Sequence, residues 1–209
     1  VIPPFAPEYD ANADHAFIQR DLEGAKALLE ANGWNEETLP TLEYGFPFSV
    51  SEQQAFEQFR SFMVDAGYPA STIRPMKFAT YGDYQRAYSQ KKIALVNSSW
   101  TMDYPDLENL MQLYYGPNSS PGSNSANFDN PQYNQLYEAT VVMDESPERT
   151  RIYREMNQLL MDDCASITGI ARTLIFLWNK DVIMRPDRSF LGGHFMKFVD
   201  LVEANKTQQ

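Results

Sequence analysis

The amino-acid sequence predicts an α/β fold in which a mixed, mostly parallel sheet is flanked by helices and followed by a helix-rich second half. In the first half, segments of helical periodicity alternate with short apolar segments typical of strands, an order that requires crossover connections. In the second half, apolar residues recur mainly at helical spacing. The chain has 209 residues, 43% of them hydrophobic, so it can bury a core without a disulfide or a structural metal.

The first half begins with a proline-rich segment, and residues 1–19 are predicted to form an extended arm. Asp21 is a suitable N-cap for the first helix, and Gly33 is a suitable stop after it. The sequence Ser51–Gln54 matches a capping box and opens a second helix, whose phenylalanine stripe we assign to the core. The expected helices span 21–32, 51–66 and 81–90, and the expected strands span 41–46, 73–79 and 93–96.

The second half is predicted to contain three helices separated by loops. The first spans 107–115, and a segment rich in Pro, Gly, Ser and Asn follows it over 116–130. Pro131 and Pro147 suit the first turns of the other two helices. In the last helix we expect an inward face of Ile152, Met156, Leu159 and Leu160 and an outward face of Glu148, Arg149, Arg151 and Glu155.

The end of the chain carries weaker signals. A late strand is expected over 174–178, a turn over 185–187, a last apolar stretch over 195–202 and a frayed tail over 203–209. No linker is strong enough to divide the chain, so the sequence predicts a single domain over 1–209.

Composition limits the classes of function. The formal net charge of -11 opposes binding to nucleic acid, whose phosphates would be repelled. Cys164 is the only cysteine, and His15 and His194 lie in no metal-ligand spacing. No apolar run approaches the length of a membrane span, and no signal peptide is recognisable. Because the chain starts at Val1 rather than Met, we expect a processed or excised piece of a longer protein.

The stretch Ile93–Asp106 carries the strongest indication of a site. Its apolar start is predicted to be a buried strand, and Trp100, Asp103 and Tyr104 follow within eight residues of the end of that strand at Val96. In open α/β sheets, ligands bind beyond the carboxyl ends of the strands. An indole, a carboxylate and a phenol at that edge are suited to hold a cation or an amine.

Each of these side chains also has a purely structural interpretation. Asp103 can cap the helix expected near Leu107, Trp100 can be an ordinary core indole, and Tyr104 can be structural. Asp106 and Glu108 are interpreted as first-turn acids that complement the helix dipole rather than as catalytic carboxylates.

Four segments, in order along the chain, resemble motifs of the family 5 extracellular solute-binding proteins, which are the dipeptide and oligopeptide receptors of ABC importers. Asp21–Gly33 resembles the family's D-x-x-x-A-K-x-L-L-x-x-A-G helix, and Trp100–Asp106 is similar to its W-x-x-D-Y-P-D-P segment. Asn127–Asn134 resembles N-x-x-N-P-x-Y-D, and Glu148–Asp163 resembles a helix of the form x-x-R-x-x-x-Y-x-x-x-x-x-L-L-x-x-D.

The resemblance implies a two-lobed, type II periplasmic-binding-protein architecture that closes on its ligand, of which this chain would be the C-terminal lobe. It implies no cofactor, no metal and no catalysis. The implied partners are a peptide or other small solute, the N-terminal lobe missing from this chain and the ABC permease subunits, with the protein a monomer. The implied location is periplasmic or extracytoplasmic, with membrane association through the transporter.

The resemblance also implies roles for four residues. Asp103 matches the aspartate that binds the N-terminal ammonium of the peptide, and Trp100 matches the tryptophan that walls a side-chain pocket. Tyr104 and Thr101 are expected at the rim. Where some oligopeptide binders carry a basic residue, this chain has Asn97, so no anchor for the peptide carboxylate is implied.

Two alternatives stay open at this level. One is a sensing or interaction module that uses the same lobe without transport. The other is a carboxylate-dependent hydrolase that uses Asp103 with Asp106 or Glu108, although no nucleophile-elbow sequence or metal-ligand spacing accompanies these acids. The ligand also stays open, because the family includes receptors for oligosaccharides and nickel complexes.

Overall fold

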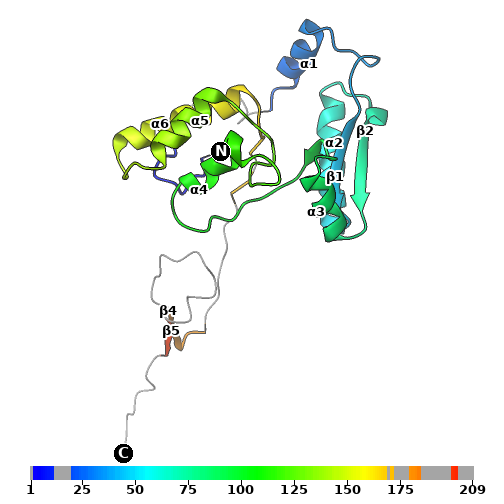
Figure 1. The fold of residues 1–209 in the computed structure, drawn as a ribbon. Helices are drawn as coiled ribbons and strands as arrows, with labels where there is room; N and C mark the ends of the chain where they lie inside the picture. Colours follow the sequence, from blue (N-terminus) through cyan, green and yellow to red (C-terminus); the bar gives the residue numbers. More distant parts are fainter. Residues whose placement is uncertain (1, 12–19, 169, 172–178, 185–198, 202–209) are drawn as a thin grey trace, which may run out of the picture. The chain divides into compact units, whose positions relative to one another are not determined.

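The structure is a computed structural model that describes residues 2–11, 20–168, 170–171, 179–184 and 199–201. Its contacts divide the chain into two compact units (Figure 1). The first unit comprises residues 1–12, 100–115 and 129–209, and the second comprises 13–99 and 116–128. The single domain over 1–209 therefore stays a prediction, and the units are described separately.

The second unit contains the parallel sheet that the alternating pattern predicts. Strand β1 (Leu42–Pro47) is central, with β2 (Ile73–Phe78) on one side and β3 (Leu95–Val96) on the other, and both pairings are parallel. Helices α2 (Val50–Asp65) and α3 (Tyr81–Ser89) contact these strands. The mostly parallel sheet with flanking helices is thus confirmed.

Aromatic side chains form the core of this unit. Tyr44 and Phe46 of β1 pack on Phe56 of α2, with ring centroids 5.8 Å apart in both contacts. Phe59 is partly buried against the same cluster, so the expected core role of the stripe is confirmed at these positions. Phe62 is 49% exposed instead, and the Arg20 guanidinium lies over its ring.

The predicted helix ends are mostly correct, with one N-cap displaced. Helix α1 (Leu22–Ala31) is capped by Asp21, whose carboxylate accepts from the Gly24 N–H. Gly33 follows α1 at a φ of 73°, where a glycine is least strained. The N-cap of α2 is Ser49, whose Oγ accepts from Glu52 N–H at 3.2 Å. The capping box assigned to Ser51–Gln54 was wrong, because Ser49–Glu52 is an overlapping match one half-turn earlier.

This overlap makes a direct test. Ser49→Ala should lower the free energy of unfolding by about 1 kcal/mol, because the Glu52 N–H loses its acceptor. Ser51→Ala should change it by less than about 0.5 kcal/mol, since Ser51 is an exposed residue inside the helix. Urea denaturation monitored by circular dichroism measures both variants. Equal losses would contradict the Ser49 cap.

Strand β3 is shorter and less buried than predicted. The sequence indicated a buried strand over 93–96, whereas the strand contains only Leu95 and Val96, both half-buried. Ile93 precedes it and packs on β1 through Gly45, where a Cβ would lie 2.3 Å from the Ile93 Cγ2. The apolar run was therefore correctly assigned to the sheet, but only half of it forms strand hydrogen bonds.

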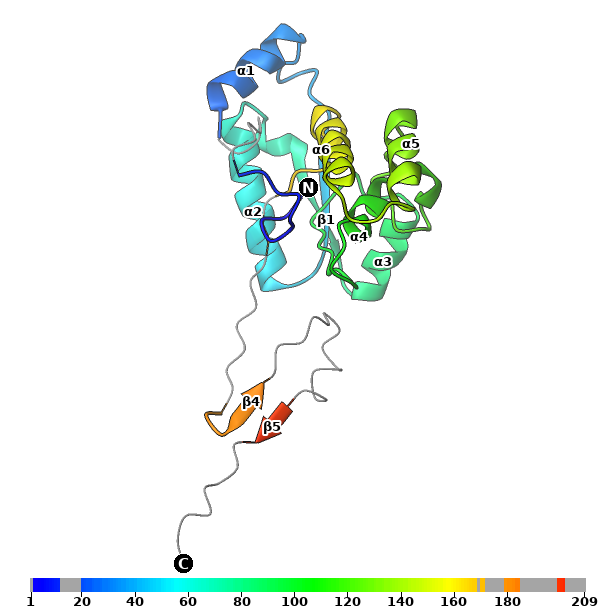
Figure 2. The same ribbon diagram turned by 90° about the vertical axis from the view of Figure 1, so that its left-hand side faces the viewer.

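The first unit is built around three helices. Short α4 (Glu108–Met111) continues into a 3-10 turn over Gln112–Tyr114, and α5 (Pro131–Thr140) and α6 (Pro147–Asp162) lie side by side in both views (Figure 2). Both prolines stand in the first turn, after the N-caps Asn130 and Ser146, as predicted. The core side chains include Tyr133, Tyr137, Ile152, Tyr153, Met156 and Leu160.

The prediction was wrong for one residue of the outward face of α6, Arg149. Arg149 is 6% exposed, because position 149 lies on the same helical stripe as Ile152, Tyr153 and Met156. The positions i, i+3, i+4 and i+7 share one face of a helix. Arg151 and Glu148, by contrast, are exposed and form an ion pair on the surface, as predicted.

The described part of the N-terminal arm is not extended over its whole length. Backbone N–H groups of Ala6 and Tyr9 donate to carbonyls three residues earlier, which makes two successive turns. Ile2 N–H donates to Asn157 Oδ1, and Arg154 Nε donates to Glu8 O. Residues 2–11 therefore contact α6.

The last described segments form a two-stranded antiparallel pairing of β4 (Val182–Met184) with β5 (Val199–Leu201). Strand β5 lies within the apolar stretch expected over 195–202, whereas β4 was not predicted. The expected strand over 174–178, the turn over 185–187 and the tail over 203–209 lie outside the described residues. None of the described helices is both long and apolar enough to cross a bilayer.

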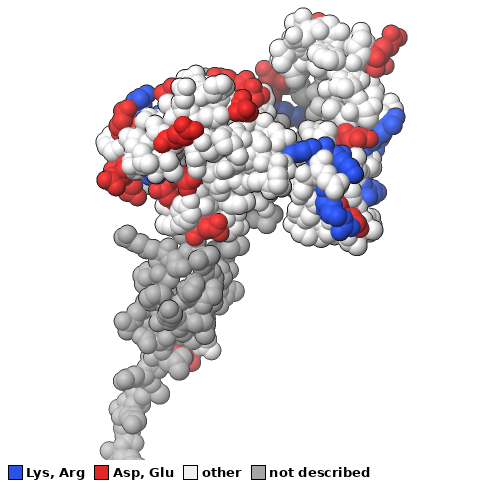
Figure 3. All heavy atoms as spheres, in the orientation of Figure 1, with Lys and Arg blue, Asp and Glu red and all other residues white. Residues whose placement is uncertain are grey.

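Charge is unevenly distributed on the visible surface. On the face shown in Figure 3, Asp and Glu side chains predominate over the first unit, whereas the second unit shows Lys and Arg side chains together with acidic ones. The predicted ligand residues belong to the first unit.

Candidate functional site

The predicted site residues lie on an exposed loop of the first unit that leads into α4. Trp100 and Tyr104 are 43% and 44% exposed, and Thr101 and Asp103 are also exposed. Met102, between them, is 8% exposed and gives the loop an apolar contact with the protein interior. Trp100 is therefore not a fully buried core residue, although its indole N–H is partly buried against Asn109, and the loop presents its aromatic and acidic residues to solvent.

Asp103 differs from the other acids of the loop. Its backbone N–H donates to Asn109 Oδ1 at 3.2 Å. Within the described ranges, its carboxylate has no hydrogen-bond or ion-pair partner. The interpretation of Asp103 as a helix cap is not met, because Asp106 makes that contact: its Oδ1 accepts from Glu108 N–H at 2.8 Å. The Asp103 carboxylate can therefore pair with a cation from outside.

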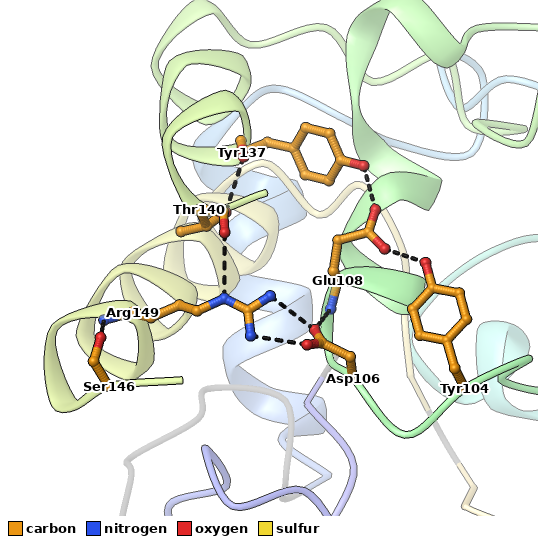
Figure 4. Close-up of polar contacts among 7 residues, drawn as sticks. All are labelled: Tyr104, Asp106, Glu108, Tyr137, Thr140, Ser146 and Arg149. Carbon is orange, nitrogen blue, oxygen red and sulfur yellow. Dashed lines mark hydrogen bonds and ion pairs between the residues drawn. The ribbon is translucent and has the colours of Figure 1, made fainter. Parts of the chain in front are cut away.

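Asp106 is bound instead to a buried arginine (Figure 4). Arg149 Nη1 and Nη2 donate to the two carboxylate oxygens at 2.9 and 3.0 Å, a bidentate pair. The Arg149 side chain is 7% exposed and that of Asp106 30%. Burial raises the pKa of Asp106, but the bonds from Arg149 and from Glu108 N–H outweigh it, so the net shift is downward.

Arg149 is supported by further contacts. Its Nε donates to Thr140 O at 3.3 Å, and its guanidinium lies 4.9 Å from the Tyr153 ring centroid. These contacts join the loop before α4 to both α5 and α6. The sequence spacing of Asp106 and Arg149 gave no indication of this pair, because the two residues are far apart in the chain.

Glu108 accepts hydrogen bonds from two tyrosine hydroxyls, those of Tyr104 and Tyr137 (Figure 4). Burial, followed by the bond to Glu108, raises the pKa of Tyr137. For Tyr104, a hydrogen bond with Asn109 lowers the pKa, but the bond to Glu108, burial and the nearby acids raise it further, so the net direction is upward. Both phenols therefore stay protonated and can donate to Glu108 at neutral pH.

These contacts add to the interpretation of the acidic segment. Glu108 lies in the first turn of α4, and Asp106 accepts the Glu108 backbone N–H there, as predicted, although α4 has only four residues. In addition, both carboxylates bind side chains of other segments: Asp106 binds Arg149 of α6, and Glu108 binds Tyr137 of α5 and Tyr104 of the loop. Nothing in this arrangement favours a hydrolase, because both acids that would assist Asp103 have committed partners. Among the described residues, no group of three or more His, Cys, Asp or Glu side chains is placed to hold a metal ion.

Neither a protein-family model nor a curated protein sequence matches this chain. Solved structures do match. The Escherichia coli murein tripeptide binding protein MppA is similar at 18% identity and a TM-score of 0.67, over 78% of this chain and 31% of that one. The periplasmic binding protein DppA from Helicobacter pylori, in complex with the peptide STSA, matches over the same shares at 17% identity and a TM-score of 0.64.

The Haemophilus influenzae OppA in complex with the peptide RPPGFSPFR matches at 15% identity and a TM-score of 0.64, over 91% of this chain and 37% of that one. The chain thus spans about a third of the length of these proteins. At sequence identities this low, the structural likeness establishes the fold alone. The chain therefore has the fold of the matched segment of these three proteins, which agrees with the fold that the family resemblance of its four sequence motifs implies.

Proposed function

We propose that this chain is the C-terminal lobe of an extracytoplasmic solute-binding subunit of an ABC importer, and that its ligands are peptides. Asp103 binds the N-terminal ammonium, Trp100 walls a side-chain pocket, and Tyr104 and Thr101 lie at its rim. The observation that carries the proposal is the difference in bonding partners among the three acids of this segment. Asp106 and Glu108 have protein partners, whereas the exposed Asp103 carboxylate has none among the described residues.

The chemistry of an ammonium anchor supports this assignment. A carboxylate that meets an ammonium away from bulk water forms a charge-assisted hydrogen bond, which is stronger and more directional than a neutral one. The exposed Trp100 indole offers a flat apolar face that accepts many side chains without selecting among them. Three proteins of the same fold are named as peptide binders or hold peptides.

The proposal extends to partners and mechanism. The remainder of a two-lobed protein would supply the opposite wall of the site, and ligand would favour the closed form because only that form makes contacts from both lobes. The whole of residues 1–209 then forms one lobe of a monomer in the periplasm or an equivalent compartment, which delivers its ligand to the permease subunits of the importer.

The test compares two forms of one peptide. The full-length gene product should bind Ala-Ala-Ala in calorimetry, and N-acetyl-Ala-Ala-Ala should bind at least about thirtyfold more weakly. Acetylation removes the ammonium and leaves the Asp103 carboxylate unpaired when the two lobes close over it, a loss of about 2 kcal/mol or more. Native mass spectrometry of the protein from its host would show the carried ligand directly. Equal binding of the two peptides, or a carried sugar, would refute the peptide assignment.

The 209-residue chain serves as the control in that experiment. It should bind Ala-Ala-Ala feebly, because it would contribute one face of the site. Micromolar binding by this chain alone would contradict the two-lobed interpretation.

A further inference from the structure

One buried amide lies next to three of the four residues that are proposed to face the ligand. Asn109 of α4 is 2% exposed. Its Oδ1 accepts from the Trp100 indole N–H at 2.8 Å and from the Asp103 backbone N–H at 3.2 Å. Its side chain also lies close enough to the Tyr104 hydroxyl to act on the pKa of that phenol. No motif of the sequence singled out this residue.

The orientation of the Asn109 amide follows from its partners. An indole N–H and a backbone N–H can only donate, so the atom that faces them both must be the carbonyl oxygen. The amide nitrogen is then left to face the Tyr104 hydroxyl, which can accept. A single carbonyl oxygen thus fixes the edge of the Trp100 ring and the backbone of Asp103 at the same point.

The short helix α4, which carries Asn109, is bonded to the rest of the unit at both of its ends. On the N-terminal side, the Asn109 N–H donates to Asp106 O at 3.0 Å, and the Asp106 carboxylate is paired with Arg149 of α6. On the C-terminal side, the buried Tyr133 of α5 donates its hydroxyl proton to Met111 O at 2.8 Å. The amide is therefore carried by a helix that is attached to both long helices of the unit.

We propose that Asn109 is a positioning residue, which holds the Trp100 wall and the Asp103 anchor at a fixed separation before ligand arrives. The consequence for ligand binding rests on the function proposed above, whereas the consequence for the loop does not. A preformed site has less conformational freedom to lose on binding, so a loosened loop binds more weakly.

The first experiment needs no ligand. The chain has three tryptophans, Trp34, Trp100 and Trp178, and therefore three indole N–H signals in a ¹H–¹⁵N spectrum, of which Trp100→Phe identifies one. Asn109→Leu should accelerate solvent exchange of the Trp100 indole proton by about tenfold, which corresponds to about 1.4 kcal/mol for the lost hydrogen bond. Asn109→Asp keeps an accepting oxygen and should keep the exchange rate within about threefold of the wild type.

A matched control separates positioning from stability. Asn157 of α6 is also buried, 7% exposed, and its Oδ1 accepts from a backbone N–H, that of Ile2. Asn157→Leu should reduce stability and leave the Trp100 exchange rate unchanged. If Asn109→Leu does not fold, Asn109→Ser replaces it, because a serine hydroxyl is too short to reach both donors. Equal exchange rates in the Leu (or Ser) and Asp variants of Asn109 would overturn the proposal.

The second experiment uses Ala-Ala-Ala and its N-acetylated form with the full-length gene product. Asn109→Leu should weaken binding of Ala-Ala-Ala by about tenfold and reduce its preference over the acetylated peptide, whereas Asn157→Leu should change neither. If the unaltered protein binds neither peptide, the proposed function fails, and the indole exchange still decides the role of Asn109. If peptides bind and Asn109→Leu keeps full affinity and preference, the positioning role in binding is refuted.

Discussion

Asp106→Ala should lower the free energy of unfolding of the first unit by about 3–5 kcal/mol. The substitution leaves the Arg149 guanidinium, whose side chain is 7% exposed, without its bidentate partner in the protein interior. A domain is stable by only about 5–15 kcal/mol, so the variant should be close to unfolding at room temperature. Urea denaturation monitored by circular dichroism measures the loss.

The surface pair on the same helix provides the control. Arg151 contacts Glu148 and Glu155, but the Arg151 side chain is 60% exposed. Arg151→Met should therefore change stability by no more than about 1 kcal/mol. In the double variant Asp106→Ala with Arg149→Met, both charges are gone, and the loss should be smaller than the sum of the two single losses. Additive losses would show that the pair is not coupled.

The same pair predicts a dependence on pH. The pKa of Asp106 is lowered in the folded protein, so the folded state binds this proton less readily than the unfolded state does. The stabilisation is then fully present above the unfolded pKa of about 4 and is lost as the pH falls through the lower folded pKa. The difference in stability between wild type and Asp106→Ala should accordingly shrink below about pH 4. A constant difference down to pH 2 would argue against the ion pair.

Asp103→Ala should remove most of the affinity of the full-length gene product for Ala-Ala-Ala, with a loss of about 2–5 kcal/mol. The peptide ammonium would be desolvated on binding and would find no carboxylate. Because the Asp103 side chain is exposed and has no partner within the described ranges, its removal should leave the urea midpoint nearly unchanged. This separation of affinity from stability distinguishes Asp103 from Asp106.

Calorimetry with a small set of variants makes the assignment specific. Asp103→Asn keeps the size of the side chain without its charge and should lose nearly as much affinity as Asp103→Ala. Asp144, an exposed acid between α5 and α6, is the matched control, and Asp144→Ala should bind normally. In Asp103→Ala the free and N-acetylated peptides should bind alike. Unchanged affinity for Ala-Ala-Ala in Asp103→Ala would remove Asp103 from the site.

The elements that the sequence predicted well depend on neighbours along the chain. Asp21 caps α1 through an N–H three residues away, and Pro131 and Pro147 occupy the first turns of α5 and α6. The limits of strands β1 and β2 agree with the predicted ones to within one residue, because apolar runs and turn residues mark these strands locally. Ser49 was missed only because two capping patterns overlap.

By itself, then, the sequence determined the α/β class, the position of most helices and strands, and the loop Trp100–Asp106 as the segment to test. Only the tertiary structure decided how the polar residues of that segment divide their roles. Arg149 reaches Asp106 from another helix, and Asn109 is buried beneath Trp100 and Asp103. Periodicity identifies the buried face of a helix, but it cannot identify the partner that a buried charge or amide meets there, because that partner is set by how the helices pack.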